Sequence, residues 1–512
     1  MSLQAAGSAG RAWLSRGRGA SILAFLLGAA SVAGFAPLYL FPLPIVTVAA
    51  LMLQWNDAGT RRRAAWLGWC FGLGYFLTGV SWVYVSLHTF GAMPAPVAAF
   101  FTLLFCAYLA LLPAATGYVA ARLPLSALLK YSMIVPAVWT LLEWLRGWLF
   151  TGFPWLALGY SQIPASPLAG YAPVFGIGGV TLATAVTAGL IATLAIALAH
   201  RARLVRQPAL YALLVLWAAG YGLLTVPWTH PVGEPLTVAL LQGNVAQDMK
   251  WRPDAVRSTL EGYLALARTT NSKLVVLPET ALPLFLRDVP EDYLRALAEH
   301  AARNGGDVLI GVPEGSHASG YYNSVISVGA SQRQVYRKWH LVPFGEFIPL
   351  RPVIGWVVDT LSIPLQDFSR GSAHPEPMHV AGQRVAVNIC YEDAFGEEII
   401  RQLPDATLLV NASNVAWFGH SIAPYQHLQI SQARALETGR YMVRATNTGM
   451  TAVVDPRGAV VAVAPQFELA TVVHEVQGYE GATPYVRWGD AAMLALCAAL
   501  VFIASLIARR RG

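Results

Sequence analysis

The chain has 512 residues, of which 55% are hydrophobic and only 12% are charged. Soluble proteins carry about 25% charged residues, so this composition excludes an ordinary soluble protein and indicates a membrane protein with room for two or three domains. The net charge is +7, but the basic residues are spread over short loops between apolar segments. We therefore expect a lipid bilayer, and no nucleic acid, as a partner.

Seven apolar segments precede residue 229, and an eighth follows residue 488. A helix needs about 20 apolar residues to cross a bilayer. The expected spans are residues 20–36, 40–55, 65–87, 95–121, 129–150, 176–199, 208–228 and 489–508. The first has the basic start and small residues of a signal peptide, but we expect it to be retained because more spans follow. We predict a seven-span region at 1–228, a polar domain at 229–488, and a last span with a basic tail at 489–512.

The basic residues fix the orientation of these spans. They occur at the N-terminus, in alternate loops and in the C-terminal tail: Arg11, Arg16, Arg18, Arg61, Arg62, Arg63, Arg122, Lys130, Arg201, Arg203, Arg206, Arg509, Arg510 and Arg511. The intervening loops at 37–40, 88–94 and 151–175 contain no lysine or arginine. By the positive-inside rule we expect both termini in the cytoplasm and residues 229–488 outside it.

Two ionisable residues, Glu143 and Arg146, stand three apart within the fifth span. Charged groups in a bilayer are costly and are usually paired or functional. We favour a mutual ion pair that locks the helix bundle, and a role in holding a lipid head group is the alternative.

The polar domain alternates between short β-branched runs and amphipathic stretches. Strands are expected at 236–241, 274–277, 308–312, 322–328, 384–389, 408–410 and 442–445, and helices at 255–267, 291–304 and 425–439. Three strands end directly in polar residues, namely Glu279, Cys390 and Asn411. Because chemistry in α/β proteins gathers where strand ends meet loops, we expect these residues to share one site.

Cys390 is the one cysteine of the polar domain, since Cys70, Cys106 and Cys497 lie in apolar segments. A solitary thiol in an oxidising compartment, at a strand end, is a candidate nucleophile. A small buried side chain is the alternative, because most free cysteines are that. One cysteine and no HExxH spacing also argue against a metal site.

A nucleophilic thiol needs a base to take its proton, and a cation or N–H groups to stabilise the tetrahedral oxyanion. Histidines are available, but none stands at a strand end with an obvious orienting partner. Glu279 ends a buried strand, and Lys338 and Glu346 flank an apolar turn. A surface cation for Lys338 and a turn residue for Glu346 are the alternatives.

A glutamate, a lysine and a cysteine in this chain order resemble the triad of the nitrilase, or carbon–nitrogen hydrolase, superfamily over about residues 235–477. With eight flanking spans, the whole chain resembles the apolipoprotein N-acyltransferase family of the bacterial inner membrane. The resemblance rests on six strings in order: Gln242-Gly243-Asn244 with Lys250-Trp251, Pro278-Glu279-Thr280-Ala281, Lys338 with Leu341-Val342-Pro343-Phe344-Gly345-Glu346, Cys390-Tyr391-Glu392, Asn411-Ala412-Ser413-Asn414 with Trp417-Phe418, and Arg444-Ala445-Thr446-Asn447-Thr448-Gly449.

This resemblance implies a nitrilase-like α-β-β-α sandwich in the periplasm, carried by an inner-membrane bundle with both termini cytoplasmic. It implies that Glu279 is the general base, Cys390 the nucleophile and Lys338 the stabiliser of the tetrahedral intermediates, with Glu346 in support. A phospholipid would acylate Cys390 as a thioester. The acyl chain would then pass to the α-amino group of the diacylglyceryl-cysteine of an apolipoprotein. No cofactor is implied, and a monomer is expected.

Aromatic residues near the motifs are the expected lipid contacts, because aromatic side chains are enriched at the membrane interface. Trp251, Tyr391, Trp417 and Phe418 are the candidates, with core packing as the alternative. Glu392 follows the nucleophile directly and is expected to hold the incoming amine or a head group.

Two other functions compete with acyl transfer. In a membrane-tethered amidase or nitrilase, water would resolve the acyl-enzyme. In a transporter or receptor the outer domain would only bind a ligand, and Cys390 would be dispensable.

Overall fold

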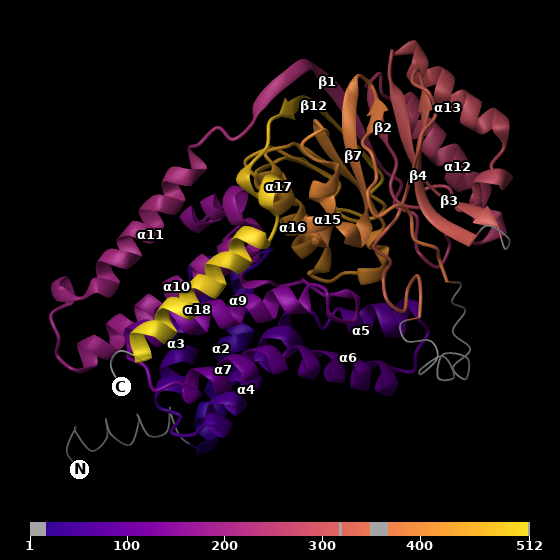
Figure 1. Ribbon diagram of the computed structural model, residues 1–512. Coiled ribbons are helices and arrows are strands. Elements are labelled where there is room, and N and C mark those ends of the chain that lie inside the picture. The colour runs from indigo at the N-terminus through magenta and orange to yellow at the C-terminus, as the bar shows by residue number, and fades with distance from the viewer. Residues whose placement is uncertain (1–16, 317–319, 349–366, 510–512) are drawn as a thin grey trace. The chain divides into compact units, whose positions relative to one another are not determined.

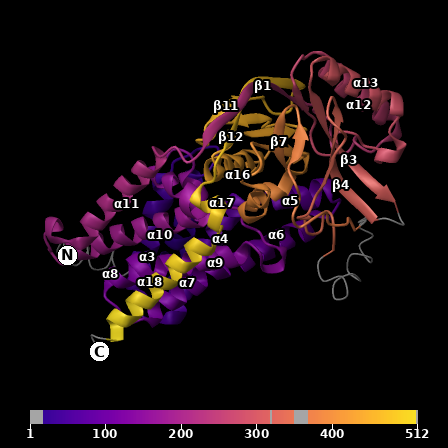
Figure 2. The same cartoon turned by 45° about the horizontal axis from the view of Figure 1, so that its top comes forward.

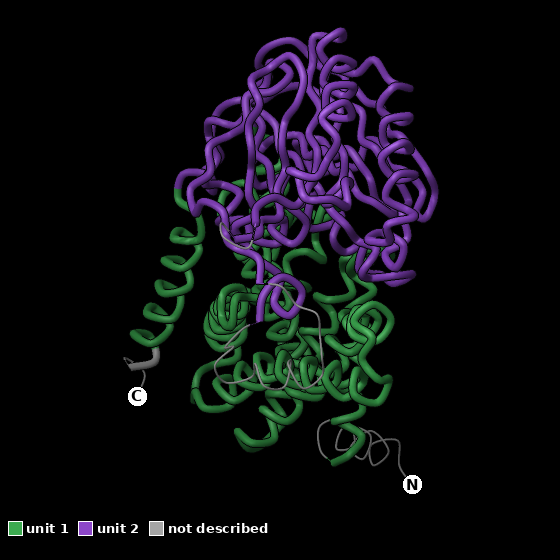
Figure 3. Tube along the Cα trace, turned by 90° about the vertical axis from the view of Figure 1, so that its right-hand side faces the viewer, with its two compact units in different colours: residues 1–226, 488–512 green, residues 227–487 purple. Residues whose placement is uncertain are grey.

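The computed structural model describes residues 17–316, 320–348 and 367–509 (Figure 1). The chain divides into two compact units (Figure 3). The helical unit comprises Met1–Val226 with Trp488–Gly512, and the α/β unit comprises Pro227–Arg487. The α/β unit is therefore an insertion in the sequence of the helical unit. Arg11, Arg16, Arg510 and Arg511, which the orientation argument used, lie outside the described residues.

A helix occupies each of the eight segments expected to span the membrane. The main helices are α2 (Gly17–Ser31), α3 (Pro42–Asn56), α4 (Arg61–Gly79), α6 (Ala95–Leu109), α7 (Leu111–Arg122), α9 (Val135–Arg146), α10 (Ala172–Ala199), α11 (Pro208–Leu224) and α18 (Ala491–Arg509). α6 and α7 follow each other almost without a break, as do α8 (Ala127–Leu129), the π-helical turn Lys130–Ile134 and α9.

Helix length supports fewer crossings than the eight expected. Four stretches among the described residues are long and apolar enough to cross a bilayer: Gly17–Gly34, Ala95–Arg122, Ala127–Arg146 and Pro167–Ala199. The span expected at 65–87 is broken, because Arg61–Gly79 and Val83–Phe90 meet at a bend of 56°. α3 and α11 have 15 and 17 residues, which at about 1.5 Å per residue is shorter than the roughly 30 Å of a bilayer core.

Small residues allow α2 and α4 to pack with their backbones in close contact. A Cβ atom added to Gly28 would stand 1.9 Å from the carbonyl oxygen of Phe71, and one added to Gly74 would stand 2.0 Å from that of Phe25. Such contacts replace the hydrophobic driving force that is missing between helices in lipid.

Glu143 and Arg146 are both held mainly by other groups. Their closest approach is 4.0 Å. Glu143 accepts hydrogen bonds from Trp139 Nε1 at 3.0 Å, Leu158 N at 3.1 Å and Thr181 Oγ1 at 3.0 Å. The Arg146 guanidinium donates to backbone carbonyls of the segment that follows the helix. The expected ion pair is present at 4.0 Å, and each charge also anchors a neighbouring segment.

The α/β unit contains two sheets of six strands (Figures 1 and 2). The first has the order β12-β1-β2-β3-β4-β5, with bounds Ala470–Glu480, His230–Gln242, Leu274–Val276, Asp307–Ser316, Gly320–Gly329 and Val335–Arg337. The second has the order β11-β10-β9-β8-β7-β6, with bounds Val460–Val463, Ala452–Val454, Met442–Thr446, Leu408–Ser413, Gln383–Ile389 and Met378–Val380. In each sheet the three central strands are parallel, β1-β2-β3 and β7-β8-β9.

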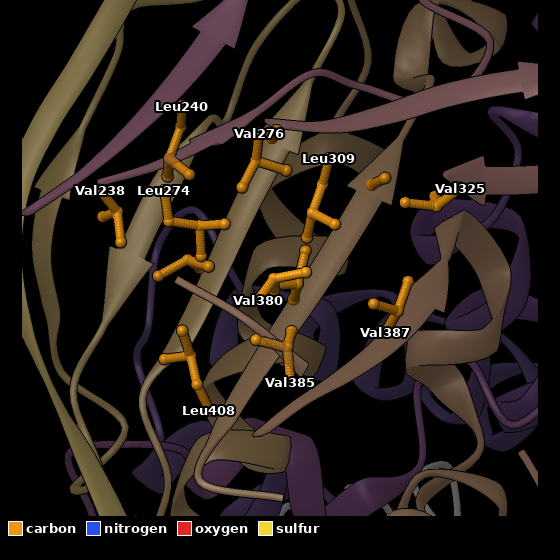
Figure 4. Packing of buried hydrophobic residues seen from close by; sticks show 14 of the residues in the cluster. Val238, Leu240, Leu274, Val276, Leu309, Val325, Val380, Val385, Val387 and Leu408 are labelled. Carbon is orange, nitrogen blue, oxygen red and sulfur yellow. The ribbon is translucent and has the colours of Figure 1, made fainter. Parts of the chain in front are cut away.

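The two sheets pack face to face, and helices cover their outer faces. Alternate residues of both sheets, such as Val238 and Leu274 in one and Val385 and Leu408 in the other, form one buried cluster (Figure 4). The opposite face of the first sheet packs on α12 (Pro253–Arg268) and α13 (Glu291–Arg303), and that of the second packs on α16 (Ala423–Thr438). Because side chains alternate between the two faces of a sheet, each strand packs against the other sheet on one face and against helices on the other. The result is a four-layered α-β-β-α sandwich.

Candidate active site

The predicted catalytic residues all follow the ends of strands in the α/β unit. Glu279 lies in the loop after β2, Lys338 comes directly after β5, and Cys390 comes directly after β7. β2 and β7 belong to different sheets. The site is therefore assembled from both halves of the sandwich.

One lysine and two carboxylates form the centre of the site. Lys338 Nζ lies 3.5 Å from Glu279 Oε1 and 2.9 Å from Glu346 Oε2. Asn323 Nδ2 donates to both carboxylates, at 2.7 Å to Glu279 and 2.8 Å to Glu346. Lys338 is 1% exposed, so it is no surface cation. Burial alone would lower the pKa of Lys338, but the charges of Glu346 and then Glu279 outweigh it and hold that pKa above its usual value.

Cys390 lies beside this cluster in a strained turn. It is the first residue of a 3₁₀ turn (Cys390–Ala394) and has a φ of 54°, a left-handed conformation that non-glycine residues rarely adopt. Burial raises the pKa of its thiol to about 12, and the charge of Glu279 acts in the same direction. The charge of Lys338 and the backbone N–H of Asn414 oppose this rise. The same Asn414 N–H donates to Glu279 Oε2 at 2.9 Å, so Glu279 and Cys390 share one donor.

The carbonyl oxygen of Cys390 is held by two side chains that the sequence did not single out in these roles. Asn411 Nδ2 contacts it at 3.2 Å and His427 Nε2 at 3.1 Å. Arg444 donates to His427 Nδ1 at 2.8 Å, and since arginine only donates, Nε2 must carry the histidine proton. Burial lowers the pKa of His427 well below its usual value, and Arg444 adds to the effect. A neutral histidine on α16 thus fixes the backbone of Cys390. Nothing in the sequence indicated this contact, because His427 lies within a helix and not at a strand end.

Glu392, expected from the sequence to hold the incoming amine or a head group, has protein donors on both of its oxygens. Glu392 is 2% exposed. Its two oxygens accept hydrogen bonds from the backbone N–H groups of Trp339, His340 and Ile389 and from the Tyr336 hydroxyl, at 2.7–3.0 Å. All of these donors come from the protein, so the carboxylate ties the β5 and β7 ends together.

The aromatic candidates differ in exposure. Trp251 is 55% exposed and Trp417 is 42% exposed, while Tyr391 and Phe418 are partly buried. Tyr391 packs edge-on against Phe395 with ring centroids 5.1 Å apart. Phe344, in the turn before Glu346, is a further exposed aromatic at 54%. The turn sequence Pro343-Phe344-Gly345 is the feature of the sequence that could have identified Phe344 as exposed.

Two family models match the chain, one in each unit. The apolipoprotein N-acyltransferase N-terminal domain matches residues 27–190, and the carbon-nitrogen hydrolase model matches residues 237–485. The α/β unit thus has the nitrilase-like fold that the sequence resemblance implied.

The chain is similar along nearly its full length to proteins named apolipoprotein N-acyltransferase. The one from Nitrosomonas europaea is 53% identical over 95% of this chain and 97% of that protein. The one from Chromobacterium violaceum is 46% identical over 96% of this chain and 94% of that protein. A solved carbon-nitrogen hydrolase from Helicobacter pylori is 16% identical with a TM-score of 0.37, covering 47% of this chain and 89% of that one. That last likeness bears no weight beside the others. The chain belongs to the apolipoprotein N-acyltransferase family.

Proposed function

We propose that this protein transfers a fatty acyl chain from a membrane phospholipid, through a thioester on Cys390, to the α-amino group of the N-terminal diacylglyceryl-cysteine of apolipoproteins. In the first half-reaction Glu279 takes the thiol proton, and the thiolate attacks an ester carbonyl carbon of the phospholipid. When the tetrahedral intermediate collapses, the C–O bond breaks. The proton passes from Glu279 to the departing lysophospholipid oxygen.

The second half-reaction uses the same groups in the same places. The amine nitrogen attacks the thioester carbon, Glu279 accepts a proton from that nitrogen, and the C–S bond breaks. The thiolate then recovers its proton. Lys338 stabilises the oxyanion in both halves, because a buried cation is strongest where water is excluded.

The observation that carries this proposal is the placement of Lys338 between Glu279 and Glu346, 3.5 and 2.9 Å away, beside Cys390. A thiol, a base and a fixed cation are what acyl transfer through a thioester requires. Trp251, Tyr391, Trp417 and Phe418 are proposed to line the path of the acyl chain, and the exposure of the two tryptophans supports this.

The proposal is tested by incubating the purified protein with radiolabelled phospholipid and a diacylglyceryl apolipoprotein peptide. We expect label in the peptide, and none with Cys390→Ser. Cys70→Ser removes a thiol from the helical unit and should retain activity. Free fatty acid without labelled peptide would identify an amidase, and full activity of Cys390→Ser would point to a binding protein.

We also propose that the helical unit crosses a bacterial inner membrane eight times, with both termini cytoplasmic, the α/β unit periplasmic, and one copy sufficient for activity. A helix at each expected segment and basic residues in alternate loops support the topology. In a Cys390→Ser background, a cysteine placed at Lys273 should react with a membrane-impermeant maleimide in intact spheroplasts, and one placed at Arg203 should react only after lysis. The reverse pattern would overturn this topology. Light scattering in detergent measures the copy number.

A further inference from the structure

The loop that follows β1, residues 243–251, is fixed to the ends of strands in the other sheet. Asn447, directly after β9, accepts from Val245 N at 3.0 Å, donates to Val245 O at 2.7 Å, and its own carbonyl accepts from Asn244 N at 2.8 Å. Asn414, after β8, donates to Gln247 Oε1 at 2.8 Å. These contacts hold the loop, and with it the end of β1, at the site.

This loop carries a second buried lysine to the site. Lys250 is 3% exposed, and its Nζ donates to the backbone carbonyl of Glu279 at 3.2 Å. Among the described residues, no carboxylate lies within 4.0 Å of that nitrogen, whereas Lys338 has two. A buried ammonium without a counter-ion is costly, so the position needs a reason.

The charges of the site supply a reason. Glu279 and Glu346 contribute two negative charges and Lys338 one positive charge, which leaves one negative charge before Cys390 ionises. When Glu279 takes the thiol proton, that negative charge moves from the carboxylate to the Cys390 sulfur. Lys338 already lies between its two carboxylates, at 3.5 and 2.9 Å. Two other buried cations, Lys250 and Arg444, have charges that act on both Glu279 and Cys390. Arg444 is paired with Asp393 at 3.3 Å, so Lys250 is the one of the two without a carboxylate partner among the described residues.

We propose that Lys250 is an electrostatic positioning residue: it provides the positive charge that balances the Cys390 thiolate, while Lys338 remains bound to Glu346 and Glu279. The inference rests on the proposed function only in taking Cys390 as the nucleophile. The groups that face Lys250 are Glu279 from the β2 end and Cys390 from the β7 end, with Lys338 and Glu346 beyond them.

The test measures the reactivity of Cys390 directly, in the full-length protein in detergent. Iodoacetamide alkylates thiolates, and mass spectrometry of the peptide containing Cys390 gives the rate. At pH 7.5 we expect Lys250→Met to react about 10-fold more slowly than the wild type, the effect of one unit in the thiol's pKa. Lys273→Met, which removes an exposed lysine of the same unit, should react at the wild-type rate. A wild-type rate for Lys250→Met would overturn the proposal.

Lys250→Arg keeps a positive charge at position 250 and changes only the pH range over which that charge is present. Burial lowers the pKa of Lys250 to about 8, while the charges of Glu279 and Cys390 oppose this. Above about pH 8 the wild type therefore loses this charge, and an arginine keeps it. The ratio of the Lys250→Arg rate to the wild-type rate should rise between about pH 8 and 10. A ratio that does not change with pH would refute the proposal, even if Lys250→Met failed to fold.

The alkylation needs no acyl substrate, so the two proposals fail separately. If the wild type transferred no acyl chain while the Lys250 variants changed the alkylation rate of Cys390 as expected, only the proposed function would be contradicted. An unchanged alkylation profile together with normal acyl transfer would contradict the role of Lys250 alone.

Discussion

Glu279 is the residue on which the site depends most, because its two carboxylate oxygens serve different partners. Oε1 accepts from Asn323 at 2.7 Å and lies 3.5 Å from Lys338 Nζ, whereas Oε2 accepts from the Asn414 N–H at 2.9 Å. The first sheet thus fixes one oxygen and the second sheet fixes the other. The carboxylate is therefore held in one orientation, as the proton transfer proposed for it would require.

Glu279→Gln should lower the rate of acyl-enzyme formation by about 100-fold or more, since general-base catalysis contributes about 10²–10⁴. The measurement is the intact mass of the protein after incubation with phospholipid alone. Glu234→Gln, at an exposed position on β1, is the control and should acylate normally. Rapid thioester formation in Glu279→Gln would remove Glu279 as the base.

Glu392 makes stability depend on pH in a defined window. Burial raises the pKa of Glu392 to about 6, against the charge of Lys338 and three hydrogen bonds. The folded protein then binds this proton more tightly than the unfolded chain, so stability falls as pH rises from about 4.5 to 6, by about 2 kcal/mol.

Thermal unfolding of wild type and Glu392→Gln between pH 4 and 7 tests this pH dependence. In Glu392→Gln the melting temperature should no longer fall between about pH 4.5 and 6 through this group, whatever its absolute value. An unchanged slope would contradict the assignment of this dependence to Glu392.

At the scale of elements, the contact of α2 with α4 depends on glycine. Gly28→Ala would place a Cβ atom 1.9 Å from the Phe71 carbonyl, so the helices must separate, at a cost of about 1–3 kcal/mol. We expect a lower melting temperature and less folded protein in detergent.

Gly222→Ala is a matched control for the α2–α4 contact. Gly222 lies in α11, and an added Cβ there meets nothing within 4 Å. Alanine should be neutral or stabilising by up to about 1 kcal/mol there. Equal losses in the two variants would show that the close packing of α2 on α4 does not explain the effect.

Helices and strands with long, regular patterns of apolar residues were predicted from the sequence, and short or irregular ones were not. The helices expected at 255–267 and 291–304 correspond to α12 and α13, which have clear apolar faces. β5, β6, β10 and β11 were not predicted, because three or four residues give too little alternation. β12 was also missed, although it has 11 residues. It alternates exposed and buried positions only weakly and pairs with β1, over 200 residues earlier.

At the scale of the whole molecule, the helical unit is completed only after the α/β unit has been synthesised. Met493 and Cys497 of α18 pack in one buried cluster with Ala137 of α9 and Leu182 of α10. A chain that ends at residue 487 would leave that apolar face uncovered.

Truncation after residue 487 should therefore lower membrane accumulation several-fold, as measured by immunoblot of membrane fractions, and expression of residues 484–512 as a separate chain should restore part of it. Truncation after residue 509, which removes only the basic tail, should accumulate normally. If the chain truncated after residue 487 accumulated as the wild type does, a structural role for α18 would be contradicted.

The sequence alone determined the division into apolar and polar parts, the strand ends, and the family to which Glu279, Lys338 and Cys390 pointed. These features depend on local composition and on order along the chain. Only the tertiary structure decided which polar groups meet. Lys250, His427 and Arg444 reach the site because strand ends far apart in the sequence converge there. The same convergence gave Glu392 its protein hydrogen-bond donors, since burial and hydrogen-bond partners are properties of the packed fold.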